Sequence, residues 1–354
     1  MEPQANPELN GQAAAEQALL DSARSGRLAH AWLLAGPRGI GKATLAYRFA
    51  RFLLAGQAAD DGLFGEAPTG LGLDPAHPTF RRVASGGHPD IRTVARGVNP
   101  KTGKARSEIV VDDVREAIAF LRLTPSEGGW RVVVVDGAED MNRNAANALL
   151  KVLEEPPARA ILLLVSHAPG RLLATIRSRC RRLDLKPLSP DLLGELLARR
   201  TSDLSMADSE LAAHLSGGSI GRAIALTEAG GVELYRDLVG LLLPLPELDA
   251  AALHRLTDRL VRSGAEDTFR MAAELLLGWL GRMLRLAATN DGMVEMLPGE
   301  LACMRRLSQT GDMERWIEFI ETTQRQFILV DAVNLDRRQV WIATLLGLQH
   351  MAGH

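Results

Sequence analysis

The chain has 354 residues, of which 46% are hydrophobic, 24% are charged and only 4% are aromatic, and its formal net charge is −2. This length exceeds one compact core and favours two or three domains. The near-zero charge argues against a protein that coats nucleic acid unaided, although it permits a subunit of a DNA-bound assembly. The two cysteines, Cys180 and Cys303, are too few for a disulfide framework or a four-cysteine zinc site.

The polarity of the first residues and the length of the apolar runs indicate in which cellular compartment the protein is expected. Residues 1–10 are polar and lack the basic-then-apolar order of a signal peptide. The apolar stretch Leu275–Leu286 is interrupted by Gly281 and Arg282, and no run reaches the about 18 apolar residues that a membrane span needs. We therefore expect a cytoplasmic protein with no membrane partner.

Strand and helix patterns alternate over the first half of the chain. Apolar residues recur at helical spacing, and uninterrupted apolar runs predict short strands between these segments. Runs without alternation are typical of strands buried on both faces, so residues 1–187 are predicted to form an α/β domain around a parallel sheet. The predicted strands are Ala31–Ala35, Ile91–Ala95, Arg131–Val135, Ala160–Val165 and Arg182–Leu185, and the predicted helices cover 11–27, 42–54, 111–123 and 144–153.

Residues 56–87 interrupt this alternation. They are rich in Gly, Pro, Asp and Ala and show little periodicity, which is typical of a long loop or an insertion. We therefore predict a loop or insertion in this segment, and the role of residues 56–107 stays open.

Beyond Pro187 the strand patterns end and helical patterns follow. A helix is predicted from Ser189–Pro190 to Arg200, and further helices extend to about Leu243 with a break at Gly217–Gly218. Residues 242–246 resemble a linker, and 250–349 are helical with breaks near 290–292 and 311. The sequence thus predicts a small helical domain over 188–245 and a larger all-α domain over 246–354.

A phosphate-binding loop is the first motif with a chemical meaning. Residues 36–42, GPRGIGK, fit the GxxxxGK pattern between a predicted strand and a predicted helix. Backbone N–H groups of such a loop cradle phosphates, the helix N-terminus adds its positive dipole end, and the lysine reaches the outer phosphates. A structural glycine turn is the alternative. The residues predicted to contact nucleotide are Gly36, Pro37, Gly39, Ile40, Gly41, Lys42, Ala43 and Thr44.

The groups that would bind Mg²⁺ are incomplete. The loop pattern calls for Ser or Thr after the lysine, because that hydroxyl binds the metal, but Ala43 stands there. Thr44 follows, rotated by about 100° around the helix. Asp136 ends the VVVV run at the position of a metal-orienting aspartate. We expect ATP or ADP to be the cofactor that the loop could hold, with an empty loop as the alternative, and we assign no metal ligand.

The run from Asn147 to Pro157, NALLKVLEEPP, resembles the bacterial DNA polymerase III clamp-loader subunits, gamma/tau and delta-prime, which are AAA+ proteins. The resemblance covers residues 11–226. It implies an AAA+ P-loop domain over 1–187, a small helical lid over 188–245 and an oligomerisation collar over 246–354. The other matching motifs are RLAHA at 27–31, HPD at 88–90, SRC at 178–180 and GGSIGRA at 217–223.

Two departures point to one branch of this family. Active members carry a glutamate after the metal-orienting aspartate, whereas this chain has Gly137; Glu139 and Asp140 follow and are read as helix-capping acids. Together with Ala43, this loss is the delta-prime pattern, so hydrolysis at the chain's own site is expected to be weak or absent. Family members often carry a zinc module, but 56–87 contains no cysteine, so no zinc is expected.

The resemblance assigns roles to three further residues. Arg179 matches an arginine finger that reaches a neighbour's ATP, a contribution worth about 10³–10⁵ in rate in GTPases. The alternative is a plain basic cluster at the sheet edge. Ser166 lies at the sensor-1 position, and Arg222 matches the sensor-2 arginine, with an exposed helix-start arginine as its alternative.

For three histidines and Cys180 we expect no catalytic role. His167 is read as a solvated loop histidine, and His30 and His88 are assigned structural roles. Cys180 is expected to be a small buried residue.

The resemblance implies a subunit with a degraded ATPase site that supplies Arg179 to gamma/tau. Its partners would be gamma/tau and delta, the sliding clamp transiently, and primed DNA through the assembly. It would serve the DNA polymerase III holoenzyme, a nucleotidyltransferase, without being a polymerase itself. The alternative is a self-sufficient AAA+ ATPase, like gamma/tau, that remodels a protein or DNA partner.

Overall fold

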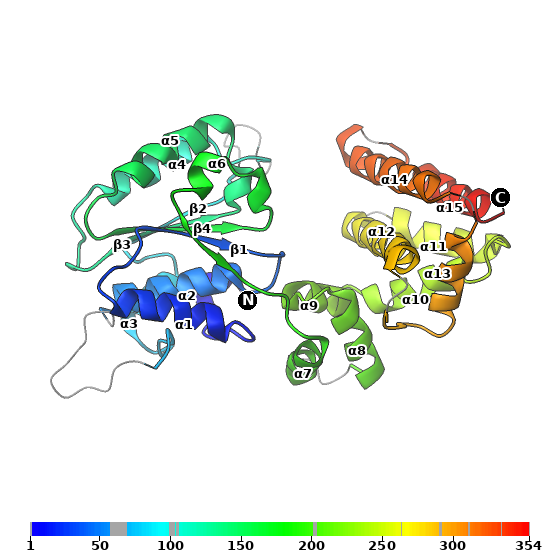
Figure 1. The fold of residues 1–354 in the computed structure, drawn as a ribbon, viewed down its shortest axis with the longest axis horizontal. Helices are drawn as coiled ribbons and strands as arrows, with labels where there is room; N and C mark the ends of the chain where they lie inside the picture. The colour runs from blue at the N-terminus through cyan, green and yellow to red at the C-terminus, as the bar shows by residue number, and fades with distance from the viewer. Residues whose placement is uncertain are drawn as a thin grey trace. The chain divides into compact units, whose positions relative to one another are not determined.

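The computed structural model describes residues 2–56, 69–98, 103, 106–200, 204–262, 264–289, 292–310, 312–333 and 335–353. The chain forms two compact units (Figure 1). The first comprises residues 1–192 and 218–221, and the second comprises 193–217 and 222–354.

A parallel sheet is the centre of the first unit. In the described residues it has five strands, in the order β2-β3-β4-β1-β5. The parallel arrangement confirms the predicted fold class, and every predicted strand is present to within one residue at either end. The strands are β1 (Ala31–Ala35), β2 (Ile91–Val94), β3 (Arg131–Asp136), β4 (Ala160–Ser166) and β5 (Arg181–Asp184).

Helices cover both faces of the sheet, because each face is apolar and must be shielded from water. Figure 1 shows α1, α2 and α3 on one face and α4, α5 and α6 on the other. These helices are α1 (Ala13–Arg24), α2 (Lys42–Leu54), α3 (Pro78–Ala84), α4 (Val111–Leu121), α5 (Arg143–Glu154) and α6 (Ala174–Arg177), with short 3-10 turns η1 (Pro3–Ala5), η2 (Ala138–Asp140) and η3 (Pro169–Arg171).

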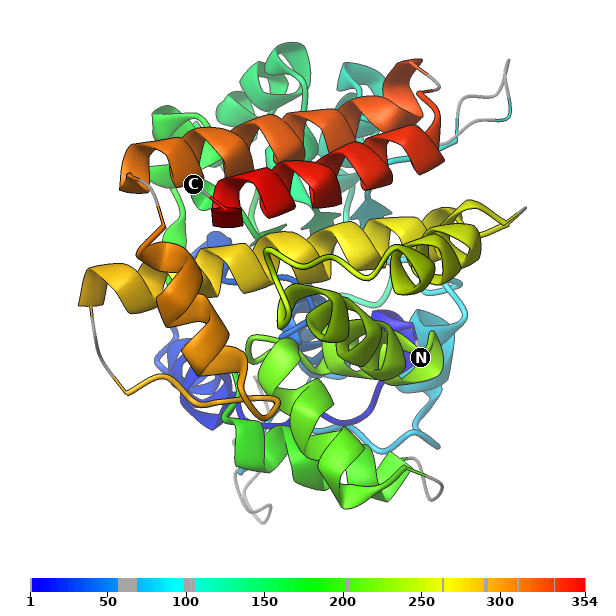
Figure 2. The same ribbon diagram turned by 90° about the vertical axis from the view of Figure 1, so that its right-hand side faces the viewer.

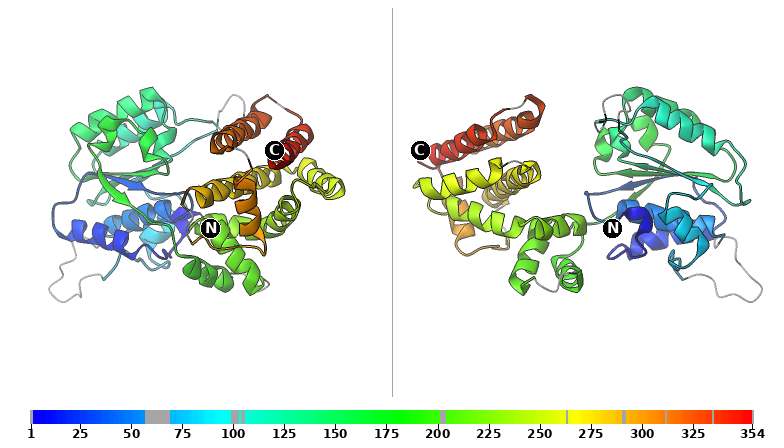
Figure 3. Two further views of the ribbon diagram at one scale, coloured as in Figure 1. Left: turned by 45° about the vertical axis from the view of Figure 1, so that its right-hand side comes forward. Right: turned by 180° about the vertical axis from the view of Figure 1, so that it is seen from behind.

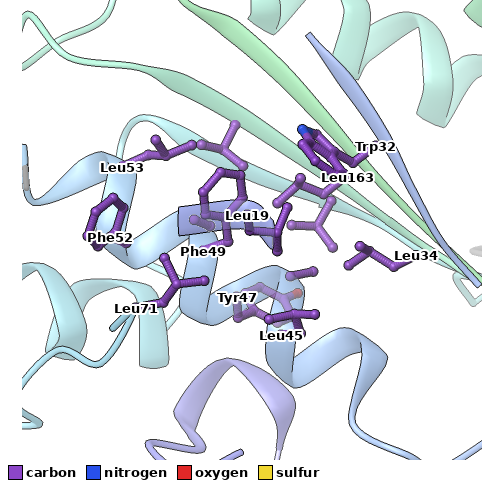
Figure 4. Close-up of a cluster of buried hydrophobic side chains, with 14 of the residues drawn as sticks. Leu19, Trp32, Leu34, Leu45, Tyr47, Phe49, Phe52, Leu53, Leu71 and Leu163 are labelled. Atoms are coloured by element: carbon purple, nitrogen blue, oxygen red, sulfur yellow. The ribbon is translucent and has the colours of Figure 1, made fainter. Parts of the chain in front are cut away.

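Alternate strand residues enter two separate cores. Trp32 and Leu34 of β1 pack with Phe49 of α2 in the first core (Figure 4), whereas Leu33 packs with Leu149 of α5 in the second. Each buried aliphatic side chain of this kind contributes about 1.5–3 kcal/mol to folding. The uninterrupted apolar runs are therefore explained by burial on both faces.

The prediction of a loop or insertion over 56–87 is wrong at its end. Residues 57–68 lie outside the described residues, but α3 forms a helix that buries Phe80 and Val83. The Nδ1 atom of His77 accepts a hydrogen bond from the Thr79 N–H at its start, and the Arg51 guanidinium lies 4.4 Å from the Phe80 ring centroid. A helix of seven residues is too short to show a clear period, which is why the sequence pattern missed it.

Helix is the only regular secondary structure among the described residues of the second unit, as predicted (Figures 2 and 3). Predicted breaks at 290–291 and 311 lie outside the described residues. A cluster of aromatic rings forms part of the core, with Phe327 stacked on Trp341 at 5.3 Å between centroids. The helices are α7 (Pro190–Arg200), α8 (Met206–Leu215), α9 (Ile220–Glu228), α10 (Gly231–Leu242), α11 (Ala250–Val261), α12 (Glu266–Thr289), α13 (Glu300–Ser308), α14 (Met313–Val333) and α15 (Arg337–Gly353).

Even the 24-residue α12 is too polar for a bilayer, and no helix of the described chain is both long and apolar enough to cross one.

A buried ion pair ties three helices of the second unit together. Glu300 of α13 is 0% exposed, and its Oε1 accepts a hydrogen bond from Arg282 Nη1 of α12 at 2.9 Å and another from the Tyr235 hydroxyl of α10. Its Oε2 accepts the Met296 and Leu297 N–H groups at 3.1 and 3.4 Å. The carboxylate is thus satisfied on both oxygens, which a buried charge requires.

Replacing Glu300 by Gln should therefore strongly destabilise the second unit. The Arg282 charge would stay buried without its counter-ion, a change that costs about 3–5 kcal/mol. Urea unfolding followed by circular dichroism measures the loss. Glu321→Gln, which removes an exposed partner of Arg325, is the matched control and should change stability by less than about 1 kcal/mol. Equal effects of the two substitutions would contradict the role given to the buried pair.

Candidate functional site

The predicted phosphate loop joins β1 to α2, and its glycines are required by the backbone. Gly36 has φ 144°, and a Cβ there would lie 2.6 Å from the Leu185 carbonyl oxygen. Gly39 and Gly41 have φ values of 70° and 99°, in the left-handed region that favours glycine. The loop therefore has the glycine-dependent backbone that a GxxxxGK turn needs, and Lys42 is the first residue of α2.

Lys42 is turned back into its own loop. Its side chain is 4% exposed, and its ammonium donates hydrogen bonds to the Gly36 carbonyl oxygen at 2.7 Å and to the Pro37 carbonyl oxygen. Burial lowers the pKa of Lys42 to about 8, although Glu139 and Asp136 attract its charge. A bound phosphate would have to replace these carbonyl contacts before the lysine could reach it.

Two contacts from outside the loop fix its carbonyl groups. The Gln12 side-chain amide donates to the Ile40 carbonyl at 3.2 Å and to the Lys186 carbonyl at 2.8 Å. The Gly221 N–H donates to the Gly39 carbonyl at 3.1 Å, and a Cβ on Gly221 would lie 3.2 Å from Gly39 Cα. Gly221, the third glycine of the GGSIGRA motif, thus allows its own backbone to approach the phosphate loop closely. Gln12 was not singled out by the sequence, because a lone amide in a helix-start segment carries no motif.

The side chains that follow Lys42 offer little to a metal ion. Ala43 is half-buried and has only a methyl group, and Thr44 is buried in the first unit. Among the described residues, no group of three or more His, Cys, Asp or Glu side chains is arranged to hold a metal.

Gly137 occupies a backbone position that disfavours glutamate. Its φ is 79°, and a Cβ there would lie 3.0 Å from Asp140 Oδ2. Non-glycine residues adopt this conformation at a cost, and a second carboxylate would also meet the Asp140 charge. The local geometry therefore disfavours a glutamate at position 137.

The structure adds a contact to Glu139 and corrects the role given to His167. Glu139 lies in the first turn of a helix, the 3-10 helix η2, as predicted, but its side chain is only 2% exposed and accepts the His167 N–H at 3.1 Å. His167 is not a solvated loop residue, because its Nε2 lies 3.1 Å from Glu139 Oε1 and its ring is largely covered. Ser166, at the end of β4, is completely buried beside them. The signal that could have found the pair is their place after the carboxyl ends of β3 and β4.

Burial also sets the charges of this cluster. It lowers the pKa of His167, although Glu139 attracts the charged form, so the imidazole is neutral at pH 7. It raises the pKa of Asp136, which ends β3 and is half-buried. Burial also disfavours ionised Glu139, but the hydrogen bonds that its carboxylate accepts from backbone N–H groups, including that of His167, outweigh burial and lower its pKa.

The two arginines with predicted roles lie in different units. Arg179 is exposed between α6 and β5, where its Nη2 is 2.8 Å from Glu154 Oε1. Arg222 belongs to the second unit, and its Nη2 is 3.8 Å from Glu274 Oε2. Cys180, next to Arg179, is buried, which raises the pKa of its thiol to about 12 and makes it unreactive.

The structural roles predicted for His30 and His88 are confirmed. His30 Nε2 lies 3.0 Å from the Leu153 carbonyl oxygen, and His88 Nδ1 accepts the Asp90 N–H at 3.1 Å. The buried Asp90 carboxylate in turn accepts the Ser126 N–H at 2.9 Å. The HPD motif thus fixes the backbone at the start of β2.

The lowered pKa of Lys42 can be measured directly. The chain has five lysines, so the ¹³Cε signals of labelled lysine should be resolved. One signal should titrate near pH 8 and be absent from Lys42→Arg, because burial disfavours its charged form. If no lysine signal titrates near pH 8, the closed arrangement of the loop is wrong.

Comparisons with known proteins identify relatives of the chain. The family described as DNA polymerase III, delta subunit, matches residues 11–189. The chain is 42% identical over 193 residues to DNA polymerase III subunit delta' of Pseudomonas aeruginosa, covering 54% of this chain and 53% of that protein. It is 38% identical over 209 residues to the Escherichia coli delta' subunit, covering 59% and 57%.

More distant proteins match more of the chain. DNA polymerase III subunit tau of Escherichia coli is 27% identical over 317 residues, which cover 84% of this chain and 45% of that protein. A solved structure, the gamma subunit-related protein of Thermotoga maritima, has 18% identity and a TM-score of 0.41, covering 94% of this chain and 99% of the other.

The match to the two delta' relatives spans only a little more than half of their length. The family model nevertheless covers half of this chain, and it includes the phosphate loop, Asp136, Ser166 and Arg179. The chain belongs to the DNA polymerase III delta-subunit family of clamp-loader proteins that includes the delta' subunits.

Proposed function

We propose that the chain is a stator-like delta-prime subunit of the DNA polymerase III clamp loader. In this role it supplies Arg179 as an arginine finger to the ATP site of an adjacent gamma/tau subunit. It joins gamma/tau and delta in the cytoplasm, contacts the sliding clamp transiently and reaches primed DNA only through the assembly. Residues 1–187 would act as the P-loop domain, 188–245 as the lid and 246–354 as the collar.

The observation that carries the proposal is the contrast between two cationic side chains. Lys42, which would serve the chain's own nucleotide, is buried and bonded to its own loop, whereas Arg179 is exposed and lies next to the buried Cys180. A guanidinium that is fixed at its base and open to solvent suits a neighbour's phosphate better than an internal one.

The chain's own loop would bind ATP or ADP without productive hydrolysis, or stay empty. Ala43 provides no hydroxyl for Mg²⁺, and Gly137 provides no base. Gly36 to Thr44 would surround the phosphates, with Asp136 and Ser166 at the carboxyl ends of the neighbouring strands, and the sensor-2 role of Arg222 stays a prediction. A self-sufficient ATPase is less well supported, since it would need both missing groups.

Arg179→Ala should sharply lower ATP hydrolysis by a loader reconstituted from this chain, gamma/tau and delta. The neighbouring site should slow by about 10³-fold, the scale of an arginine finger in GTPases. Total turnover by the loader should fall by at least the fraction of wild-type turnover that this neighbouring site contributes. The measurement is DNA- and clamp-stimulated turnover, after size-exclusion chromatography has shown an intact complex.

Arg182→Ala is the matched control for this test. Arg182 is exposed, lies three residues away and pairs with Asp184 of the same strand. Its loss should leave turnover unchanged. Equal turnover for wild type and Arg179→Ala would refute the finger assignment.

A further inference from the structure

Arg179 is carried by a short segment with a fixed backbone. Ile176 and Cys180, on either side of it, are buried in the core between the sheet and α5. The Arg179 N–H also donates to the Ile176 carbonyl at 3.1 Å. The Cα position of Arg179 is therefore set by the core, while its side chain lies at the surface.

Two groups then hold the guanidinium itself. Its Nη1 donates to the Thr175 carbonyl of α6 at 3.0 Å, and its Nη2 lies 2.8 Å from Glu154 Oε1. Glu154 is the last residue of α5, which packs against α6. The Thr175 carbonyl of α6 and the Glu154 carboxylate of α5 thus define the direction in which the Arg179 guanidinium points.

Neighbouring arginines have other kinds of partner. Arg177 donates to the Pro169 carbonyl at 3.4 Å, Arg181 lies 4.8 Å from the Trp32 ring centroid, and Arg182 pairs within its own strand. Of these four arginines, Arg179 alone has an ion pair with a carboxylate of a different element in the described chain. The pair therefore distinguishes the proposed finger from the basic cluster around it.

The pair contributes little to folding, because both side chains are exposed: 36% for Arg179 and 51% for Glu154. It does restrict the rotamers of a long side chain, and that restriction removes part of the entropy cost of later binding. A triphosphate carries more charge than one carboxylate, so it can take over the guanidinium that Glu154 has aligned.

We propose that Glu154 is the positioning residue of Arg179 and holds its guanidinium in the direction from which it meets the neighbour's phosphate. The inference rests on the proposed function and adds a second residue to it. It also gives a physical role to the first glutamate of the LEEPP motif, which the sequence left without one.

The test compares five loaders that differ only in this chain: wild type, Glu154→Gln, Glu154→Ala, Arg179→Ala and the Glu154→Ala/Arg179→Ala double variant. Turnover at the neighbouring site should fall about tenfold in Glu154→Ala, since a misplaced catalytic group loses much of its effect. Glu154→Gln keeps an acceptor oxygen, so its turnover should lie between that of Glu154→Ala and that of wild type. The fall should be in kcat, with KM for ATP unchanged.

A double-mutant comparison separates positioning from a merely structural role. The double variant should be no slower than Arg179→Ala, because Glu154 acts only through the arginine. Glu155→Ala, the adjacent exposed glutamate, is the matched control and should behave as wild type. If Glu154→Ala equals wild type while Arg179→Ala is slow, the inference is overturned and the proposed function stands. If Arg179→Ala is also unchanged, both are overturned.

The isolated chain gives a second readout. Arg179 guanidinium NMR signals, assigned by their loss in Arg179→Lys, should show slow rotation about the Nε–Cζ bond in wild type. They should average in Glu154→Gln while Glu155→Gln leaves them unchanged. Averaged signals already in wild type would show that Glu154 does not hold the guanidinium and would overturn the inference without any partner present.

Discussion

Parallel pairing of three strands brings the phosphate loop, Asp136 and Ser166 together. The register of β1 with β4 sets Ala35 beside Ser166, and that of β3 with β4 sets Asp136 beside Val165. All three strands therefore end at the same edge of the sheet, and the phosphate loop, Asp136 and Ser166 follow directly from those ends. Ligands of open α/β sheets are bound at this carboxyl edge.

The polar groups collected at this edge are bonded within the chain. Lys42 is bonded to loop carbonyls, and Glu139 lies against His167, which burial keeps neutral. Active nucleotide sites leave such groups open to phosphate and Mg²⁺. Here these groups make contacts within the chain itself. This supports the proposal that Arg179 serves the ATP site of a neighbouring subunit.

Much of the fold could be predicted because the three central strands consist almost entirely of buried apolar residues. The Val run of β3 and the Leu run of β4 have no polar positions, so only a sheet covered on both faces explains them. Helix α3 could not be predicted, since seven residues and a histidine cap leave no periodic signal. The role of residues 56–107 stays open.

The candidate site was predictable only where a local motif marks it. GPRGIGK and SRC identify residues by spacing alone, whereas Glu139 with His167 and Glu154 with Arg179 join positions 28 and 25 residues apart. Such contacts depend on which strands and helices become neighbours, and that information lies in the tertiary fold. The three-domain division and the roles of Ser166 and Arg222 stay predictions.

We propose that this chain does not hydrolyse ATP at its own nucleotide site. The most direct measurement is ATP hydrolysis by the purified chain without any partner, with wild type beside Lys42→Ala. We expect the same background rate for wild type and Lys42→Ala, because the hydroxyl that would bind Mg²⁺ and the catalytic base are missing. Hydrolysis in wild type that Lys42→Ala abolishes would contradict the account and identify a self-sufficient ATPase.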